Sequence, residues 1–327
     1  MHYTTLGATG LKVSVAGLGC GGNSLLGKSA GLTQSQSADL VRAALDLGVT
    51  FLDTAEAYGT EEIVGEAIAS RPRDRIVIST KSRIEQRVGM PGGAAGLMSG
   101  ADVVANLDAS LRRLRTDYVD VFHLHAVSPS GYDHALHEIA PAVLREKAKG
   151  KLRHLGITET SPFDHEQEMA ARAVTDDVWE VIMIAYHMLN QKPRQTIFPH
   201  TQKKRIGTLL MFVVRNIFSR PEVLARTMAA LAAAGKLPPE LASVTDPLDF
   251  LVHEAGATSI TDAAYRFGRH EPGADVVLFG TGSVEHLRAN VTSILRPALP
   301  AADVTRLYAL FAGLRGVGLD LPDRMKA

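Results

Sequence analysis

Short apolar runs alternate with amphipathic segments along almost the whole chain, and this alternation constrains the fold most. The runs are rich in β-branched or aromatic residues and apolar on both faces, which is typical of buried parallel strands. They lie at 13–19, 51–55, 76–81, 118–125, 152–158, 179–186, 208–214 and 275–280. Segments with helical periodicity lie between them, at 35–48, 61–71, 101–115, 141–150, 165–174, 258–270 and 283–295. The sequence therefore predicts the α/β class, as a (β/α)8 TIM barrel.

Three additions to the barrel are expected. Residues 3–14 alternate around a glycine-containing turn, which predicts a small hairpin closing the bottom of the barrel. The predicted strands begin 25 to 42 residues apart until Thr208, and the eighth begins 67 residues later at Asp275. This surplus predicts a helical insertion after the seventh strand, with helices near 221–235 and 239–255. An extra C-terminal helix is expected over 303–316, and residues 1–327 are interpreted as a single domain, since no linker divides them.

Composition excludes several classes of function. Lysine and arginine number 35, as do aspartate and glutamate, so the formal net charge is zero. A neutral chain has no overall field to attract nucleic acid or an anionic membrane, and neither partner is expected. The only cysteine, Cys20, rules out an intramolecular disulfide or a multi-cysteine metal site. Because no secretory signal pattern opens the sequence and its apolar runs fall short of ~18 residues, a soluble cytoplasmic protein is expected.

Four polar residues fall at or just after the carboxyl ends of consecutive predicted strands, where barrel enzymes place their active sites. Asp53 ends the second strand, Tyr58 follows on the next loop, Lys81 ends the third strand and His125 ends the fourth. A tyrosine can deliver a proton to a carbonyl oxygen, and a nearby ammonium lowers its pKa from about 10. An aspartate keeps the lysine charged, and a histidine can orient the same oxygen. The set suits proton transfer to a carbonyl.

These motifs resemble the aldo-keto reductase family. The matching pieces are GLGCGG, FLDTAEAYG, STK, YVDVFHLH, LRHLGIT and GTGSVEHLRAN, which span residues 17 to 290 in the family's order. The resemblance implies a catalytic tetrad of Asp53, Tyr58, Lys81 and His125, with Tyr58 as the general acid and base and His123 as a structural residue. It also implies hydride transfer, without a metal, between a nicotinamide cofactor and a small-molecule carbonyl or alcohol: an aldehyde, ketone or sugar.

The resemblance further implies that the cofactor lies across the mouth of the barrel. The positions carried over for cofactor binding are Gly19, Cys20, Asp53, Thr158, Glu159, Met183, Phe212, Arg215, Gly280, Thr281, Gly282, Ser283, His286 and Asn290. Independently of the resemblance, a helix N-terminus after the eighth strand, with the hydroxyls of Thr281 and Ser283, is a candidate anion site.

Several of these positions depart from the family's pattern. Thr158 and Glu159 stand in place of the usual Ser-Asn pair, and Met183 stands in place of a glutamine that contacts the carboxamide. Gly280 and His286 stand where many members carry the lysine and arginine that bind a 2′-phosphate. The resemblance favours NADP(H), and NAD(H) stays open.

Two other functions are compatible with the sequence. The altered carboxamide contacts would suit a cofactor-binding regulatory subunit with weak or no turnover. Lys81 would be the Schiff-base nucleophile of a barrel lyase or isomerase, although the Asp53–Tyr58 spacing has no part in that chemistry. Candidate substrate loops lie at 20–27, 85–100, 126–135 and 217–257. Both a monomer and a homo-oligomer are compatible with the sequence.

Overall fold

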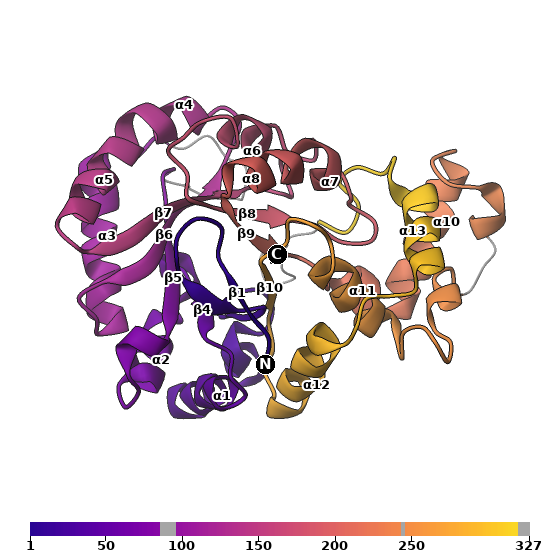
Figure 1. The fold of residues 1–327 in the computed structure, drawn as a ribbon, viewed down its shortest axis with the longest axis horizontal. Helices are drawn as coiled ribbons and strands as arrows, with labels where there is room; N and C mark the ends of the chain where they lie inside the picture. Colours follow the sequence, from indigo (N-terminus) through magenta and orange to yellow (C-terminus); the bar gives the residue numbers. More distant parts are fainter. Residues whose placement is uncertain (86–95, 243–245, 320–327) are drawn as a thin grey trace.

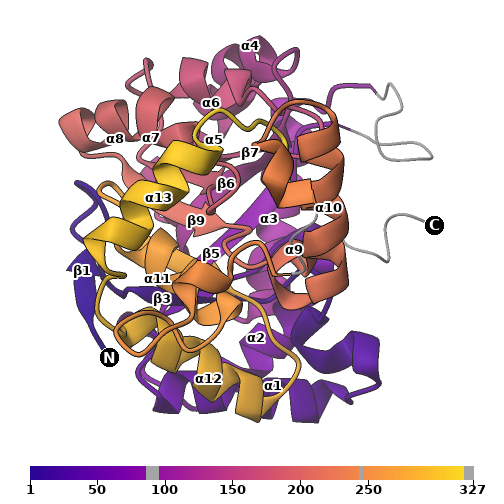
Figure 2. The ribbon, with the colours of Figure 1, turned by 90° about the vertical axis from the view of Figure 1, so that its right-hand side faces the viewer.

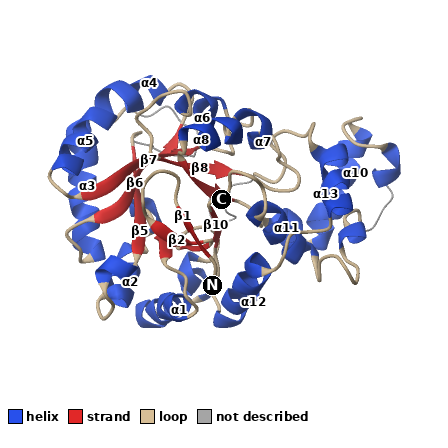
Figure 3. Ribbon diagram, viewed as in Figure 1, coloured by secondary structure: helices blue, strands red, loops and turns tan. Residues whose placement is uncertain are grey.

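A closed barrel of eight parallel strands forms the centre of the molecule, and helices surround it (Figure 1, Figure 3). The computed structural model describes residues 1–85, 96–242 and 246–319. The strands follow one another round the barrel in chain order, and the last pairs with the first. They are β3 (Ala16–Gly19), β4 (Phe51–Asp53), β5 (Val77–Arg83), β6 (Val119–Val127), β7 (Leu152–Glu159), β8 (Val181–Ala185), β9 (Gly207–Met211) and β10 (Val276–Phe279). The predicted (β/α)8 barrel is confirmed.

Helices follow each strand and cover the outside of the barrel. They are α1 (Gln34–Asp46), α2 (Glu61–Ile68), α3 (Gly100–Leu114), α4 (Tyr132–His134), α5 (Ala140–Ala148), α6 (Glu168–Ala173), α7 (Pro193–Thr196), α8 (Phe198–Lys204), α11 (Ile260–Arg269) and α12 (Val284–Leu295). Thr33 and Ser99 begin α1 and α3 with capping boxes, which satisfy backbone N–H groups that the first helical turn leaves unpaired. The pair α7 and α8 was not predicted, because Pro193 and Pro199 interrupt the helical pattern there.

The N-terminal hairpin closes the bottom of the barrel, as predicted. Its strands β1 (Tyr3–Thr5) and β2 (Lys12–Ser14) pair antiparallel. Leu6, Leu11 and Val13 pack in one buried cluster with side chains of the barrel interior such as Phe51. The predicted strand 13–19 is wrong as one element: the chain leaves the hairpin after Ser14, whose hydroxyl donates to the Ala16 carbonyl (2.7 Å), before β3 begins.

The insertion after β9 extends to the side of the barrel that carries α11 and α12, together with the C-terminal helix α13 (Ala301–Phe311) (Figure 1, Figure 2). It contains α9 (Asn216–Ser219) and α10 (Pro221–Ala233). The helix predicted at 239–255 is wrong, since its described part holds only the 3-10 turns Pro239–Ala242 and Asp249–Leu251. Pro247 interrupts that stretch, because it lacks an N–H and disfavours helical geometry at the residue before it.

Along β4 and β5 the interior of the barrel changes from apolar to polar. Alternate residues of a strand face the same side, so Phe51 is followed inside the barrel by Asp53, and Val77 by Ser79 and then Lys81. The apolar layer seals the bottom, and the polar layer lies at the carboxyl ends. Of the predicted substrate loop 85–100, residues 86–95 lie outside the described residues. No described helix has the length and apolarity to cross a membrane.

Candidate active site

Asp53 and Lys81 form a buried ion pair at the carboxyl ends of β4 and β5. Lys81 Nζ donates to Asp53 Oδ2 and to the Thr54 carbonyl, each at 2.7 Å. The Ser79 hydroxyl donates to the other carboxylate oxygen at 2.8 Å. Lys81 is 0% exposed and Asp53 4%. The carboxylate is therefore fixed by the strand that carries the lysine, and the ammonium is directed by two acceptors.

Tyr58 lies on a single 3-10 turn, Glu56–Tyr58, that follows β4. Its ring centroid is 5.1 Å from Lys81 Nζ, and its hydroxyl is 3.5 Å from His125 Nε2. The Tyr58 and His125 rings meet edge to face. On another side, a Cβ at Gly21 would lie 2.6 to 2.8 Å from the ring, so only glycine leaves room for it. The four residues of the sequence-predicted tetrad thus lie together.

Burial dominates the electrostatics of this cluster. Desolvation disfavours the Lys81 ammonium, but the neighbouring groups, Asp53 first among them and then Tyr58, together outweigh it and raise the pKa of Lys81. Burial raises the pKa of Asp53, and Lys81 opposes that shift. Burial also raises the pKa of Tyr58, although the Lys81 ammonium acts in the opposite direction. The expected net lowering of the Tyr58 pKa is therefore wrong for this structure, because desolvation of the phenolate exceeds the effect of the ammonium.

His123 lies one interior position below His125 on β6 and pairs in register with Lys81. It is 0% exposed, and burial followed by the Lys81 charge holds its pKa well below the usual range. A Cβ at Gly156 would lie 2.3 Å from His123 Nδ1. His123 is thus a neutral imidazole packed against Gly156.

A cavity of about 660 Å³ opens beside this cluster, with Asp53 and Tyr58 in its wall. This volume is in the usual range for cofactor and small-molecule sites. Most sequence-predicted cofactor positions line it: Gly19, Asp53, Met183, Phe212, Arg215, Gly280, Thr281, Gly282, His286 and Asn290. The Arg215 guanidinium lies 4.2 Å from the centroid of the Phe212 ring.

Four sequence-predicted cofactor positions do not line the cavity. Cys20 is 0% exposed, and burial raises the pKa of its thiol. The Thr158 hydroxyl accepts from the Ala126 N–H at 2.7 Å. The Ser283 hydroxyl caps α12 by accepting from the His286 N–H at 3.1 Å. Each of these three is committed to a contact or a packing position within the protein.

Glu159 is the fourth, and it is buried beneath the ends of β7 and β8. Its Oε1 accepts from the Ser161 hydroxyl (2.9 Å), the Gln167 amide (3.2 Å) and the Ala185 N–H (2.5 Å). Burial raises its pKa from about 4.5 to about 7, against these hydrogen bonds. Within the described chain, Glu159 Oε2, Gln167 Oε1 and Asn190 Oδ1 are buried without a hydrogen-bond partner.

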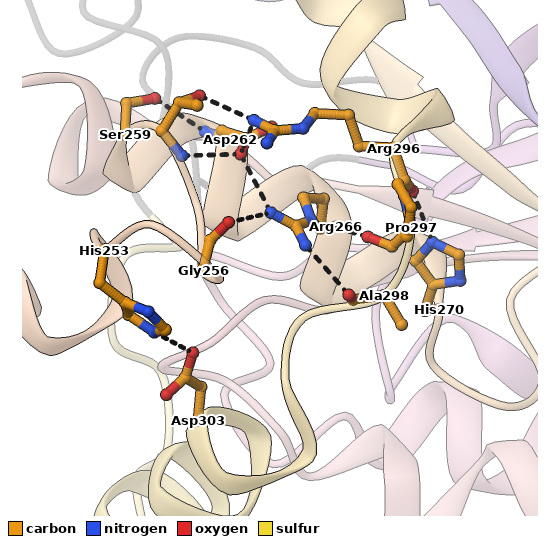
Figure 4. A network of polar contacts seen from close by, with 11 residues as sticks. His253, Gly256, Ser259, Asp262, Arg266, His270, Arg296, Pro297, Ala298 and Asp303 are labelled. Atoms are coloured by element: carbon orange, nitrogen blue, oxygen red, sulfur yellow. Dashed lines mark hydrogen bonds and ion pairs between the residues drawn. The ribbon is translucent and has the colours of Figure 1, made fainter.

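Residues at the start of α11 complete the far wall of the cavity, and sequence reasoning missed them: Ser259, Thr261 and Tyr265. A buried guanidinium holds this helix in place (Figure 4). Arg266 donates to the carbonyls of Gly256 (2.8 Å), Pro297 (2.7 Å) and Ala298 (3.0 Å), and Asp262 pairs with both Arg266 and Arg296. The insertion, α11 and the segment before α13 are thereby joined behind the cavity.

The described residues contain no group of three or more histidine, cysteine, aspartate or glutamate side chains placed to hold a metal ion. The polar groups at the site are instead those of proton transfer: a phenol, an ammonium paired with a carboxylate, and an imidazole.

Comparison with known proteins agrees with this arrangement. The profile of the Aldo/keto reductase family matches residues 17–311, and the chain belongs to that family of oxidoreductase enzymes, which act on carbonyl compounds. It is 29% identical over 303 residues to the aldo-keto reductase YhdN of Bacillus subtilis, covering 88% of this chain and 87% of that one. It is also 29% identical over 216 residues to L-galactose dehydrogenase of Arabidopsis thaliana, with 64% of each chain covered.

A solved structure shares the fold over its whole length. Aldo-keto reductase AKR11C1 from Bacillus halodurans, in its holo form, superposes with a TM-score of 0.69 at 23% identity, covering 100% of both chains.

Proposed function

We propose that this chain transfers a hydride between a nicotinamide cofactor and an aldehyde, ketone or sugar, with Tyr58 as the general acid and base. The observation that carries the proposal is the buried Lys81–Asp53 ion pair beside Tyr58 at the edge of the cavity. A purely structural ion pair would have no reason to adjoin a tyrosine that lines the cavity and has a histidine nitrogen 3.5 Å from its hydroxyl.

The proton chemistry follows from the environment of Tyr58. Because burial raises its pKa, Tyr58 is a neutral phenol that can donate to a carbonyl oxygen. As the proton leaves, the phenolate forms beside the Lys81 ammonium, which stabilises the developing charge. His125 Nε2, at 3.5 Å from the phenol oxygen, orients the substrate oxygen. The cofactor supplies or accepts the hydride.

The cavity suits a dinucleotide by shape and by the groups that line it. Phe212 offers a flat ring and Arg215 a cation, and the loop before α12 contributes two glycines with Thr281 between them. Met183 lines the wall without the amide that would pair with a carboxamide. Phe212 would hold the nicotinamide ring, Arg215 the pyrophosphate, and the loop before α12 the adenosine.

We further propose that NAD(H) is accepted at least as well as NADP(H), which the family resemblance favours. Arg215 is the only arginine or lysine in the described wall, and α12 presents His286, Ala289, Asn290 and Ser293. Hydroxyl and amide groups suit a ribose, whereas a 2′-phosphate adds close to two negative charges that Arg215 alone would have to balance.

Substitution at His286 tests the cofactor preference. His286→Arg adds a charged donor at this wall, and a hydrogen bond to a charged group contributes about 1.5–3 kcal/mol. We therefore expect NADPH to bind about 10- to 100-fold more tightly, with NADH affinity within twofold of the parent. Fluorescence titration with each cofactor measures this, and exposed Arg145→Ala is the control. Equal gains for both cofactors would refute the assignment of His286 to the 2′-phosphate end.

Substitution at Tyr58 tests the reaction. Tyr58→Phe keeps the ring between Gly21 and Lys81 and removes only the hydroxyl, so we expect kcat to fall about 10²- to 10⁴-fold while the cofactor dissociation constant stays within twofold. Turnover of NADH and NADPH with a panel of aldehydes, ketones and sugars gives the readout. Activity that survives the substitution would refute the role of Tyr58.

The regulatory-subunit alternative rests on the altered carboxamide contacts and predicts tight cofactor binding with slow turnover in the same assay. A cytoplasmic location is also part of the proposal. The single cysteine of the sequence, Cys20, is a buried free thiol and is compatible with a reducing compartment. Cell fractionation tests it.

A further inference from the structure

The turn that carries Tyr58 is too short for its own hydrogen bonds to fix its position. It is a single 3-10 turn, with Tyr58 N–H bonded to the Ala55 carbonyl at 3.0 Å and Gly59 N–H to the Glu56 carbonyl at 3.4 Å. Ala55 before it is extended, and Gly59 after it is left-handed with φ 65°. Such a turn takes its position from contacts with neighbouring elements, so the position of the Tyr58 hydroxyl depends on what anchors the turn.

Glu56 supplies an anchor to the strand that carries Lys81. Its Oε1 accepts from the Arg83 N–H at 3.0 Å, and the Ser82 hydroxyl shares its proton between Glu56 Oε1 at 3.2 Å and the Arg83 carbonyl at 3.0 Å. Ser82 and Arg83 directly follow Lys81 in β5. The Asn106 amide of α3 donates to the Ser82 hydroxyl at 2.9 Å, so the anchor extends into the helix shell. One carboxylate thus joins the Tyr58 turn to the end of β5.

The rest of the turn is held on its other side. Lys28 Nζ donates to the Gly59 carbonyl at 3.1 Å, and Gly21 lies directly against the Tyr58 ring. Without Glu56, the turn would keep these contacts and lose its side-chain hydrogen bonds to the end of β5, while Thr54 before it stays bonded to Ser79 and Lys81. The distance that would then change is the one between Tyr58 and the pair formed by Lys81 and His125.

We propose that Glu56 is a positioning residue that holds Tyr58 against Lys81 and His125 by tying the 56–58 turn to the end of β5. This inference rests on the proposed function, since it acts through Tyr58. Catalysis is sensitive to such displacement, because a misplacement of about 1 Å can cost about 10²-fold in rate.

Three variants separate positioning from general folding. Glu56→Ala removes the acceptor, and we expect kcat to fall about 10- to 100-fold with cofactor affinity and substrate KM within twofold of the parent. Glu56→Gln keeps an acceptor oxygen for the Arg83 N–H and is expected to restore most of kcat. Glu62→Ala, at an exposed position in the first turn of α2, is the matched control and is expected to leave kcat unchanged.

A double variant shows whether Glu56 acts through Tyr58. In the Tyr58→Phe background, Glu56→Ala is expected to lower kcat by less than twofold, because the hydroxyl that it positions is absent. If Glu56→Ala fails to fold, Ser82→Ala replaces it, since that variant removes one of the two donors and is expected to lower kcat several-fold.

The outcomes distinguish the two proposals. Equal activity of Tyr58→Phe and the parent would overturn the proposed function. The positioning role alone would be overturned in two cases, both with a strong effect of Tyr58→Phe. In the first, Glu56→Ala has the same kcat as the control Glu62→Ala. In the second, Glu56→Ala lowers kcat as much in the Tyr58→Phe background as in the parent. Failure of Glu56→Gln to recover kcat would also count against it, because the amide oxygen can still accept from Arg83.

Discussion

Replacing Glu159 with glutamine should remove a pH-dependent cost of folding. Glu159 is 2% exposed, and its pKa is raised from about 4.5 to about 7 in the folded protein. The folded state therefore keeps a proton that the unfolded state releases, so the contribution of Glu159 to stability is fully present below pH 4.5 and is lost as the pH rises through about 7. A pKa raised from about 4.5 to about 7 corresponds to about 3 kcal/mol, most of which is lost between pH 5 and pH 8.

The local geometry explains why a proton is tolerated there. The unpartnered atoms of this described cluster are acceptor oxygens, on Glu159, Gln167 and Asn190. A protonated Glu159 adds the donor that the cluster lacks, whereas the ionised form adds charge without a counter-ion. Glutamine keeps an oxygen for the Ser161, Gln167 and Ala185 donors and carries no charge.

Urea unfolding of both proteins at pH 5, 6, 7 and 8 measures the effect. We expect the stability of Glu159→Gln relative to the parent to rise by about 2–3 kcal/mol from pH 5 to pH 8. Glu62→Gln, at an exposed position, is the control and should show no such trend. Parallel pH profiles for the parent and Glu159→Gln would refute the reasoning, because they would mean that Glu159 titrates alike in the folded and unfolded states.

Two further substitutions test the buried charges. Asp53→Asn leaves the Lys81 ammonium buried without its carboxylate, so we expect the loss of about 3–5 kcal/mol in unfolding free energy and of turnover. Adding Lys81→Met should restore part of the stability and none of the turnover. A double variant no more stable than Asp53→Asn would contradict this. Arg266→Ala leaves three carbonyls without this donor and removes one of the two arginines that pair with Asp262. Urea unfolding should therefore show a loss of about 3–5 kcal/mol, against little change for the exposed Arg145→Ala.

The barrel and the tetrad were accessible from the sequence because both depend on local signals. Strand ends are visible as the points where apolar runs stop, and in a parallel barrel all carboxyl ends meet at one face. That rule brought Asp53, Lys81 and His125 together without knowledge of any contact. The extent of the chain as one domain stays a prediction of the same reasoning.

Other features required the folded structure. The far wall of the cavity comes from α11. Ser259 and Thr261 follow Asp53 by more than 200 residues in the sequence, and nothing in their local sequence indicates that they line the same cavity. Glu159 was assigned to the cofactor by its motif position, but its side chain is directed to the Ala185 N–H instead. The net pKa of Tyr58 depended on the degree of burial, which the spacing of residues does not determine.

The pairing of β10 with β3 sets the moment at which the cavity can form during synthesis. Phe279 pairs with Leu18, and Gly282 lies so close to Gly27 that its added Cβ would be 3.0 Å from the Gly27 Cα. The first barrel strand, through Gly19, and the last, through Leu278 and Phe279, therefore form one side of the cavity together, and they can meet only after residue 279 of 327 has been synthesised. A chain that ends before β10 lacks Leu278, Phe279 and the glycine loop of the cavity wall, so we expect cofactor binding only once synthesis has passed α12.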